Sequence, residues 1–300
     1  IGPWYGNEFY GALSGDRSGS PARAVNARDN RRMYTWENLL MYNKTFKKDH
    51  TLGVTFLQSI QQETYEKSEI KVKDLPYENQ EWNNVGSAQM IESVSSDYRR
   101  WRLASFMGRV NYNFKDRYLL TISARYDGSS RLATGHKWVL FPSAAFAWRI
   151  KEESFLKDVD YLSNLKLRLG WGITGNTAID PYKTQGSLSY GRYSYGSNGV
   201  LAFYQNEMPN PNLSWEKTQQ WNAGIDFGFL NGRIGGSVDL YLQNTNDLLM
   251  DRQLPIVSGF GGVTTNIGKT RNKGLEITLN TINIDTKDFK WSTDVMFSTR

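Results

Sequence analysis

The chain has 300 residues, and its 36 Lys and Arg against 30 Asp and Glu give a net charge of +6. Aromatic residues make up 14% of the sequence, a content that excludes a disordered chain. There is no Cys, which excludes disulfides and thiolate chemistry. The mean hydropathy of −0.57, with no apolar run near 18 residues, excludes a bundle of transmembrane helices. It does not exclude a transmembrane β-barrel, whose strands alternate in polarity.

Alternation of apolar and polar residues predicts long strands in chain order. Ten are expected, at about 31–46, 50–66, 98–115, 117–127, 138–150, 164–174, 215–229, 233–248, 263–282 and 289–300. Where the alternation is clearest, one face of the strand is free of charge. The other face carries polar residues that we expect to line a water-filled lumen, namely Arg109, Asn111, Asn113, Arg125, Asp127 and Arg168. A shift of one residue would exchange the faces, so each strand's orientation is well specified.

The links between these strands alternate in length. Short links are expected at 47–49, around 116, at 151–163, at 231–232 and at 283–288, and longer ones at 67–97, 128–137, 175–214 and 249–262. Transmembrane barrels alternate in this way, with short periplasmic turns and long extracellular loops. A soluble β-sandwich shows the same alternation of side chains but has no reason to alternate its links. Aromatic residues near the strand ends also suit the two interfacial girdles of a barrel.

Several motifs do not support enzymatic or nucleotide-binding chemistry. The glycines of 170–175 match a dinucleotide-binding pattern, but no amphipathic helix follows, so we interpret them as thinning the lumen wall. His50 and His136 are isolated, which predicts no metal site, and no cofactor is expected. Lys and Arg are spread over many strands, whereas nucleic-acid binding needs a concentrated patch. We therefore expect neither an enzyme nor a nucleic-acid-binding protein.

The long link at 175–214 is rich in tyrosine and glycine. Its rings could stack on sugars or peptide side chains, or they could only pack the loop against its neighbours. Because binding residues concentrate on loops, four of the tyrosines are candidate ligand contacts. They are Tyr190, Tyr193, Tyr195 and Tyr204.

Several segments resemble the SusC/RagA family of TonB-linked outer-membrane proteins. They include 108–112, 118–121, 125–131, 141–143, 147–150, 153–156, 165–168, 172–176, 212–218, 238–241, 266–268 and 272–276. Their order and spacing resemble the second half of that family's barrel, clearly over 98–300 and more weakly over 31–66. Arg125, Asp127 and Arg131 match a conspicuous motif of the family.

The resemblance implies an all-β fold, an antiparallel transmembrane β-barrel of 22 strands of which this chain supplies about ten. It implies active import of oligosaccharides or peptides across the outer membrane of a Gram-negative cell, with a SusD-like surface lipoprotein as partner. Energy would come from the TonB complex through an N-terminal contact. Because the chain starts at Ile1 and ends at Arg300 in what looks like an unfinished strand, we expect residues 1–300 to belong to one barrel domain. The plug domain, the TonB contact and the signal peptide are then expected outside them.

Two alternatives stay open at this stage. A passive porin would have the same strands and links without a plug or a TonB contact. A soluble secreted carbohydrate-binding or glycosidase β-domain would have the same alternation of side chains. The barrel expectation predicts that the long links lie at one end of the sheet and the short ones at the other.

Overall fold

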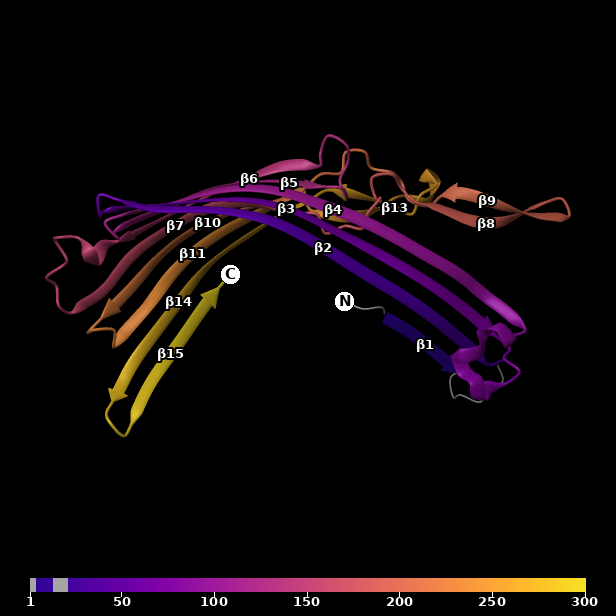
Figure 1. Ribbon diagram of the computed structural model, residues 1–300, viewed down its shortest axis with the longest axis horizontal. Coiled ribbons are helices and arrows are strands. Elements are labelled where there is room, and N and C mark those ends of the chain that lie inside the picture. The colour runs from indigo at the N-terminus through magenta and orange to yellow at the C-terminus, as the bar shows by residue number, and fades with distance from the viewer. Residues whose placement is uncertain (1–3, 13–20) are drawn as a thin grey trace. The chain divides into compact units, whose positions relative to one another are not determined.

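The computed structural model describes residues 4–12 and 21–300 and is dominated by β-strands. Eleven strands form one sheet in the order β1-β2-β3-β4-β5-β6-β7-β10-β11-β14-β15 (Figure 1). The bounds are β1 Trp4–Tyr10, β2 Arg23–Phe46, β3 His50–Lys73, β4 Met90–Phe114, β5 Tyr118–Ser129, β6 Trp138–Arg149, β7 Leu162–Asn176, β10 Glu216–Phe229, β11 Ile234–Asn246, β14 Lys269–Asp285 and β15 Lys290–Thr299. Two hairpins form separate sheets, β8 (Leu188–Tyr195) with β9 (Asn198–Gln205) and β12 (Leu249–Gln253) with β13 (Gly262–Asn266).

Three short 3-10 helices complete the fold, η1 (Glu78–Ser87), η2 (Ile150–Glu152) and η3 (Ile256–Ser258). No helix in the described residues has the length and apolarity needed to cross a membrane. The chain divides into two compact units, one made of residues 1–36 and 60–103 and the other of residues 37–59 and 104–300.

The first unit has a small apolar core beside η1. Ala22, Ala24, Val72 and Leu75 are buried there, and Phe9, Trp82 and Val85 pack against them. β1 pairs with β2 from Trp4 opposite Asp29 to Tyr10 opposite Arg23. The sequence did not predict β1, because its seven residues are too few to show a clear alternation. The strand expected at 31–46 therefore starts earlier, at Arg23, and has β1 beside its first residues.

The second unit has one apolar and one polar face, as the alternation predicted. In β10, for example, Trp221, Ala223 and Ile225 lie on the apolar face, and Asn222 and Asp226 lie on the polar face. Cross-strand partners share a face, and the printed register pairs Trp221 with Trp171 and Asp226 with Lys166. The strands expected from 117 to 248 lie within a few residues of their observed bounds.

The links of the second unit alternate as expected. Because consecutive sheet strands are antiparallel neighbours, the links at 47–49, 115–117, 150–161, 230–233 and 286–289 share one end of the sheet, which we call the turn end. The links at 130–137, 177–215 and 247–268 share the other, the loop end. The predicted Asn-Gly turn is present, with positive φ at Asn231 (53°) and Gly232 (83°).

Several predicted boundaries are wrong. The link expected at 67–97 is shorter, because β3 runs to Lys73 and β4 begins at Met90. The segment expected as one strand at 263–282 is two, β13 and β14, separated at Gly268, whose φ of 91° interrupts the extended chain. The segments 175–214 and 249–262, expected as loops, hold the hairpins β8–β9 and β12–β13. These short strands carry apolar residues on both faces or polar residues on both, so alternation could not reveal them.

Aromatic rings form two belts on the apolar face of the second unit. The turn-end belt consists of Phe114, Tyr118, Trp148, Phe227 and Phe229, and the loop-end belt of Phe106, Tyr126, Trp138, Trp171 and Trp221. Along β5, Tyr118 and Tyr126 are eight residue steps apart, about 26 Å at the usual strand rise. With the usual strand tilt of about 35–45°, that length rises about 19–22 Å across the membrane, most of the apolar band of outer-membrane barrels, which is about 25 Å tall.

A carboxylate holds the turn-end belt in place. Glu153 accepts hydrogen bonds from the Tyr118 hydroxyl (2.6 Å) and the Trp148 indole (3.1 Å), and it pairs with Arg117 at 3.2 Å. The Tyr118 hydrogen bond, followed by that of Trp148 and the Arg117 charge, keeps the pKa of Glu153 below its ordinary value. The link at 150–161 is thereby attached to the first residues of β5 and the last of β6.

The loop end is fixed by a buried aromatic cluster. Trp215 (4% exposed) meets Phe141 edge to face at 5.3 Å, and its indole donates to the Lys137 carbonyl at 2.8 Å. Leu213 is fully buried beside it, and its carbonyl accepts from the Ala133 amide at 3.1 Å. These contacts join the link at 130–137 to the end of the link at 177–215, just before β10 begins.

Candidate functional site

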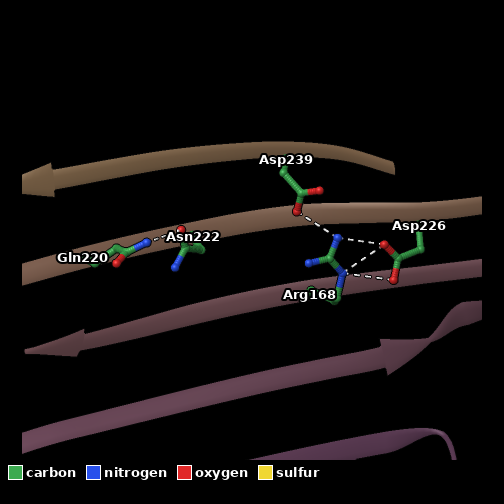
Figure 2. A network of polar contacts seen from close by, with 5 residues as sticks. All are labelled: Arg168, Gln220, Asn222, Asp226 and Asp239. Carbon is green, nitrogen blue, oxygen red and sulfur yellow. Dashed lines mark hydrogen bonds and ion pairs between the residues drawn. The ribbon is translucent and has the colours of Figure 1, made fainter. Parts of the chain in front are cut away.

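A charged cluster occupies the centre of the polar face in the second unit. Arg168 on β7 reaches Asp226 on β10 with three contacts of 2.7–3.0 Å and Asp239 on β11 with one of 2.8 Å. Figure 2 shows the guanidinium between the two carboxylates, which come from neighbouring strands. The three side chains are 25–38% exposed, so water reaches the cluster. One fixed cation therefore orients two acidic groups on a wetted wall.

The register explains how Arg168 reaches across a whole strand. Gly224 lies between Arg168 and Asp239 in one cross-strand row. A Cβ at Gly224 would lie 2.2 Å from Asp239 Oδ1 and 2.8 Å from Arg168 Nη2. The glycine is therefore the space through which the ion pair forms.

Gly224→Ala is expected to separate Arg168 from Asp239 and to cost about 1 kcal/mol, because the pair is partly exposed. The urea midpoint of the folded full-length protein measures the loss. Gly170→Ala, also on the polar face, is the matched control, since its Cβ would meet Asn222 only at 3.8 Å. Since Asp239→Asn already weakens the pair, Gly224→Ala should cost less in that background. An equal cost in both backgrounds would contradict the assignment.

A recess of about 590 Å³ adjoins this cluster. Its wall is mostly amide and charged groups, provided by Arg168, Gln220, Asn222, Asp239, Gln243, Asn272, Glu276 and Arg300. Gln220 donates to Asn222 at 3.1 Å along β10, as Figure 2 shows. Such a surface offers hydrogen-bond donors and acceptors to a polar molecule.

The other polar residues predicted from the sequence make separate contacts on the same face. Arg125 pairs with Asp127 at 2.7 Å and donates to Ser105 at 3.0 Å. Asn111 accepts from the Thr121 hydroxyl at 2.9 Å. Asn113 bonds Asp116 at the turn end, and Arg109 is exposed. The structure thus spreads these residues along the wall and brings none of them except Arg168 into the central cluster.

The four candidate tyrosines lie on the β8–β9 hairpin at the loop end (Figure 1). They are 56–78% exposed. The register places Tyr193, Tyr195 and Tyr204 on one face of the hairpin, because Tyr204 lies opposite Ser189. Tyr190 lies opposite Phe203 on the other face. The hairpin therefore presents a face of three tyrosines, which we call the tyrosine face, and the fourth tyrosine points away from it.

His50 and one of the glycines that the sequence analysis singled out make close structural contacts. No group of three or more His, Asp or Glu side chains in the described residues is arranged to hold a metal ion. His50 bonds the Tyr112 hydroxyl at 2.6 Å and stacks near Phe114. The glycines that the sequence assigned to thinning a polar wall have a more specific use at Gly172, which lets Ser143 approach closely from β6.

Sequence reasoning did not single out Asp226, Asp239 or Gly224. Alternation placed Asp226 and Gly224 on the polar face, but the row that joins Gly224 to Arg168 and Asp239 depends on the register between strands. The only signal in the sequence was Gly224 in the middle of a strand, since a glycine there often marks a site where another group approaches the backbone closely.

The fold and the two-faced sheet define a β-barrel wall, and comparison with known proteins specifies it. The family model described as "TonB dependent receptor-like, beta-barrel" matches residues 2–299. The chain belongs to this TonB-dependent receptor-like β-barrel family.

Individual relatives agree with this assignment. The chain is 48% identical over 198 residues to the TonB-dependent receptor SusC of Bacteroides thetaiotaomicron, a match that covers 63% of this chain and 19% of SusC. It is 33% identical to the TonB-dependent receptor P26 of Formosa agariphila, covering 95% of this chain and 28% of that protein. The solved RagAB peptide transporter superposes with a TM-score of 0.81 at 25% identity, over 92% of this chain and 30% of the matched chain. The chain thus spans less than a third of the length of these relatives.

Proposed function

We propose that this chain is the barrel wall of a TonB-dependent importer of oligosaccharides or peptides in the outer membrane. One observation carries the proposal, a single sheet with an uncharged apolar face between two aromatic belts and a polar opposite face. Contact with lipid requires the uncharged apolar face, and a water-filled passage requires the polar face. Membership in the TonB-dependent receptor family supports active import over the passive porin.

In this proposal the polar wall contacts cargo. Arg109, Asn111, Asn113, Arg125, Asp127 and Arg168 face the lumen, and the recess beside Arg168 and Asp239 offers fixed charges to hydroxyl, amide or ammonium groups. Contacts of this kind are made without covalent chemistry, so the chain needs no cofactor. The tyrosine face adds flat rings that suit sugar faces and peptide side chains.

We infer two protein partners from the resemblance to SusC and RagAB. A SusD-like surface lipoprotein would close the loop end, and the TonB complex would act through a segment outside residues 1–300. The match to a solved peptide transporter supports peptide as cargo, and the resemblance to the SusC/RagA family keeps oligosaccharide as the other cargo class.

Uptake of fluorescent oligosaccharides and peptides by intact cells tests the proposal. We expect uptake of one cargo class to be lost in cells that lack this gene and equally in cells that lack TonB. Uptake that persists without TonB but not without this gene would establish the passive porin instead. Purification of the full-length protein from membranes should recover the lipoprotein in equal amount, and its absence would remove that partner.

The orientation gives a separate prediction about the two ends of the sheet. Gly199 lies in the β8–β9 hairpin at the loop end and Asn231 in the tight turn at the turn end, and both are exposed. A membrane-impermeant maleimide should label Gly199→Cys in intact cells and should label Asn231→Cys only after the outer membrane is opened. Labelling of both positions from outside would contradict the barrel orientation.

A further inference from the structure

Four cations lie on the apolar side of the sheet at its loop end. Lys273 shares a cross-strand row with Trp221 of the loop-end belt, and the other three lie beyond that row. Lys269, Arg271 and Lys273 occupy alternate positions of β14 and therefore share a face. Across β11, Lys269 is in the row of Lys217, and Arg271 is in the row of Gln219. The same face continues as Leu275, Ile277 and Leu279, so the charges stand where the apolar band ends.

This cationic surface has no acidic neighbour in its own rows. The register defines nine outward positions on β10, β11 and β14, all within the described residues: Lys217, Asn246, Lys269, Gln219, Asn244, Arg271, Trp221, Leu242 and Lys273. Four are cations and none is a carboxylate. Arg271 donates to Asn244 at 2.7 Å, which directs its guanidinium across the strands. Lys269, Arg271 and Lys273 are exposed and Lys217 is half-buried.

An apolar groove adjoins the cations on the membrane side. It holds about 480 Å³, within the range of about 300–1,000 Å³ of ligand sites. Its lining includes Ala144, Ala223, Phe146, Leu169, Trp221 and Leu240. Leu169, Trp221 and Leu240 are 44–55% exposed, so the groove opens outward.

Gln219, in the row of Arg271, contacts two tryptophan rings that line the groove. With its amide oxygen toward the rings, Gln219 accepts from the indole nitrogens of Trp171 at 3.0 Å and Trp221 at 3.3 Å. Each Trp thus points its apolar edge to the groove and its N–H toward the charged rows. Tryptophan at a membrane interface takes this orientation, with one end in lipid and one end wet.

We propose that this surface, Lys217, Lys269, Arg271 and Lys273 above the Trp171–Trp221 groove, binds one phosphate-bearing lipid of the leaflet at the loop end. The phosphate lies on the cations and an acyl chain lies in the groove. The order of apolar groove, indole N–H groups and cations follows the order of acyl chain, interface and headgroup in a lipid. This assignment rests on the proposed function only in placing the apolar face in a membrane.

Binding of the phosphate by the cations is tested with full-length protein in detergent. The protein is titrated with phosphorylated lipid A, and binding is followed by native mass spectrometry. The variant Lys217→Gln with Lys269→Gln and Lys273→Gln removes three cations and keeps the Arg271–Asn244 bond. Since each cation near an anionic lipid surface contributes a factor of about five, we expect lipid affinity to fall at least tenfold. The matched control is Lys47→Gln with Lys48→Gln and Lys287→Gln, three exposed lysines at the turn end, and it should bind as the wild type does.

Two further results decide the chemistry. Dephosphorylated lipid A should bind the wild type at least tenfold more weakly, and equal binding would overturn phosphate recognition. Millimolar inorganic phosphate should not displace the lipid, whereas displacement would show a site for a soluble anion.

The groove is tested by Ala223→Phe, which fills it and should weaken lipid binding severalfold with the cations intact. Unchanged binding would overturn the proposal that an acyl chain lies in the groove.

Measuring cargo import distinguishes a failure of the lipid-site proposal from a failure of the proposed import function. The triple Lys variant should lose lipid affinity and still import cargo and run as a folded barrel on unheated gels. Loss of lipid binding with normal import supports the lipid site. Normal lipid binding in a protein that does not import would refute the importer and leave the lipid site standing.

Discussion

Gly175→Ala is expected to lower the amount of folded protein in the outer membrane at least fivefold. Its Cβ would lie 2.1 Å from Phe141 Cζ and 2.8 Å from Trp215 Cε3. Both rings are buried, and Trp215 is held by its bond to Lys137, so neither can move aside without opening the loop-end cluster. Overpacking of this kind costs about 1–3 kcal/mol or more, and a cost of that size changes cellular abundance severalfold.

The matched control for this substitution is Gly108→Ala. Gly108 is also a strand glycine, but no atom lies within 4 Å of the Cβ that alanine would add. Membrane levels from quantitative immunoblots should therefore be normal for Gly108→Ala and low for Gly175→Ala. Phe141→Leu should partly restore the Gly175→Ala protein, because the shorter side chain vacates the space of the ring. Equal levels of the two glycine variants would show that the loop-end cluster tolerates rearrangement.

The sequence was sufficient to predict the two faces of the strands with the clearest alternation, because period-two alternation is a local property. Arg125, Asp127 and Arg168 lie on the polar face, and Trp221 and Ile225 on the apolar face, as alternation predicted. The strands that alternation missed include β1 and β8. β1 is short, and β8 carries exposed side chains on both faces, with Leu188 and Tyr190 on one and Tyr193 on the other. A strand that buries neither face leaves no alternation to detect.

Pairing between strands could not be predicted. Arg168, Asp226 and Asp239 are up to 71 residues apart in the sequence, and only the register brings them into contact. The space at Gly224 follows from the same register. The cations of β14 illustrate the point again, since the sequence shows Lys269, Arg271 and Lys273 as one alternating run and gives no sign that Lys217 joins them.

The register also divides the four tyrosines that the sequence grouped together. Tyr193 and Tyr195 lie on the tyrosine face with Tyr204, and Tyr190 lies opposite Phe203 on the other side of the hairpin. The turn at Gly196, with φ of 64°, fixes which residues oppose each other. A ligand that meets one face of the hairpin therefore meets three tyrosines or one, but not all four.

Tyr193→Ala with Tyr195→Ala is expected to weaken cargo or lipoprotein binding by the full-length protein ten- to a hundredfold. Both rings are highly exposed, at 63% and 78%, so they add little to the stability of the hairpin and are free to cover a ligand. Losing a well-packed ring at an interface costs about 1–3 kcal/mol, which corresponds to this range of affinity. Cargo affinity is measured by calorimetry on the purified protein, and lipoprotein binding by its recovery in a pull-down.

The opposite face of the same hairpin provides the control. Tyr190→Ala with Phe203→Ala removes two rings that are equally exposed, at 66% each, and should leave the ligand of the tyrosine face bound. If both double variants weaken binding alike, the hairpin acts through its overall shape, because two faces that point apart cannot contact one ligand surface. If neither does so at normal membrane levels, the rings only pack the loop. A loss confined to Tyr193 and Tyr195 assigns recognition to the tyrosine face, whose hydroxyl-rimmed rings suit a polar ligand better than the leucine and phenylalanine behind them.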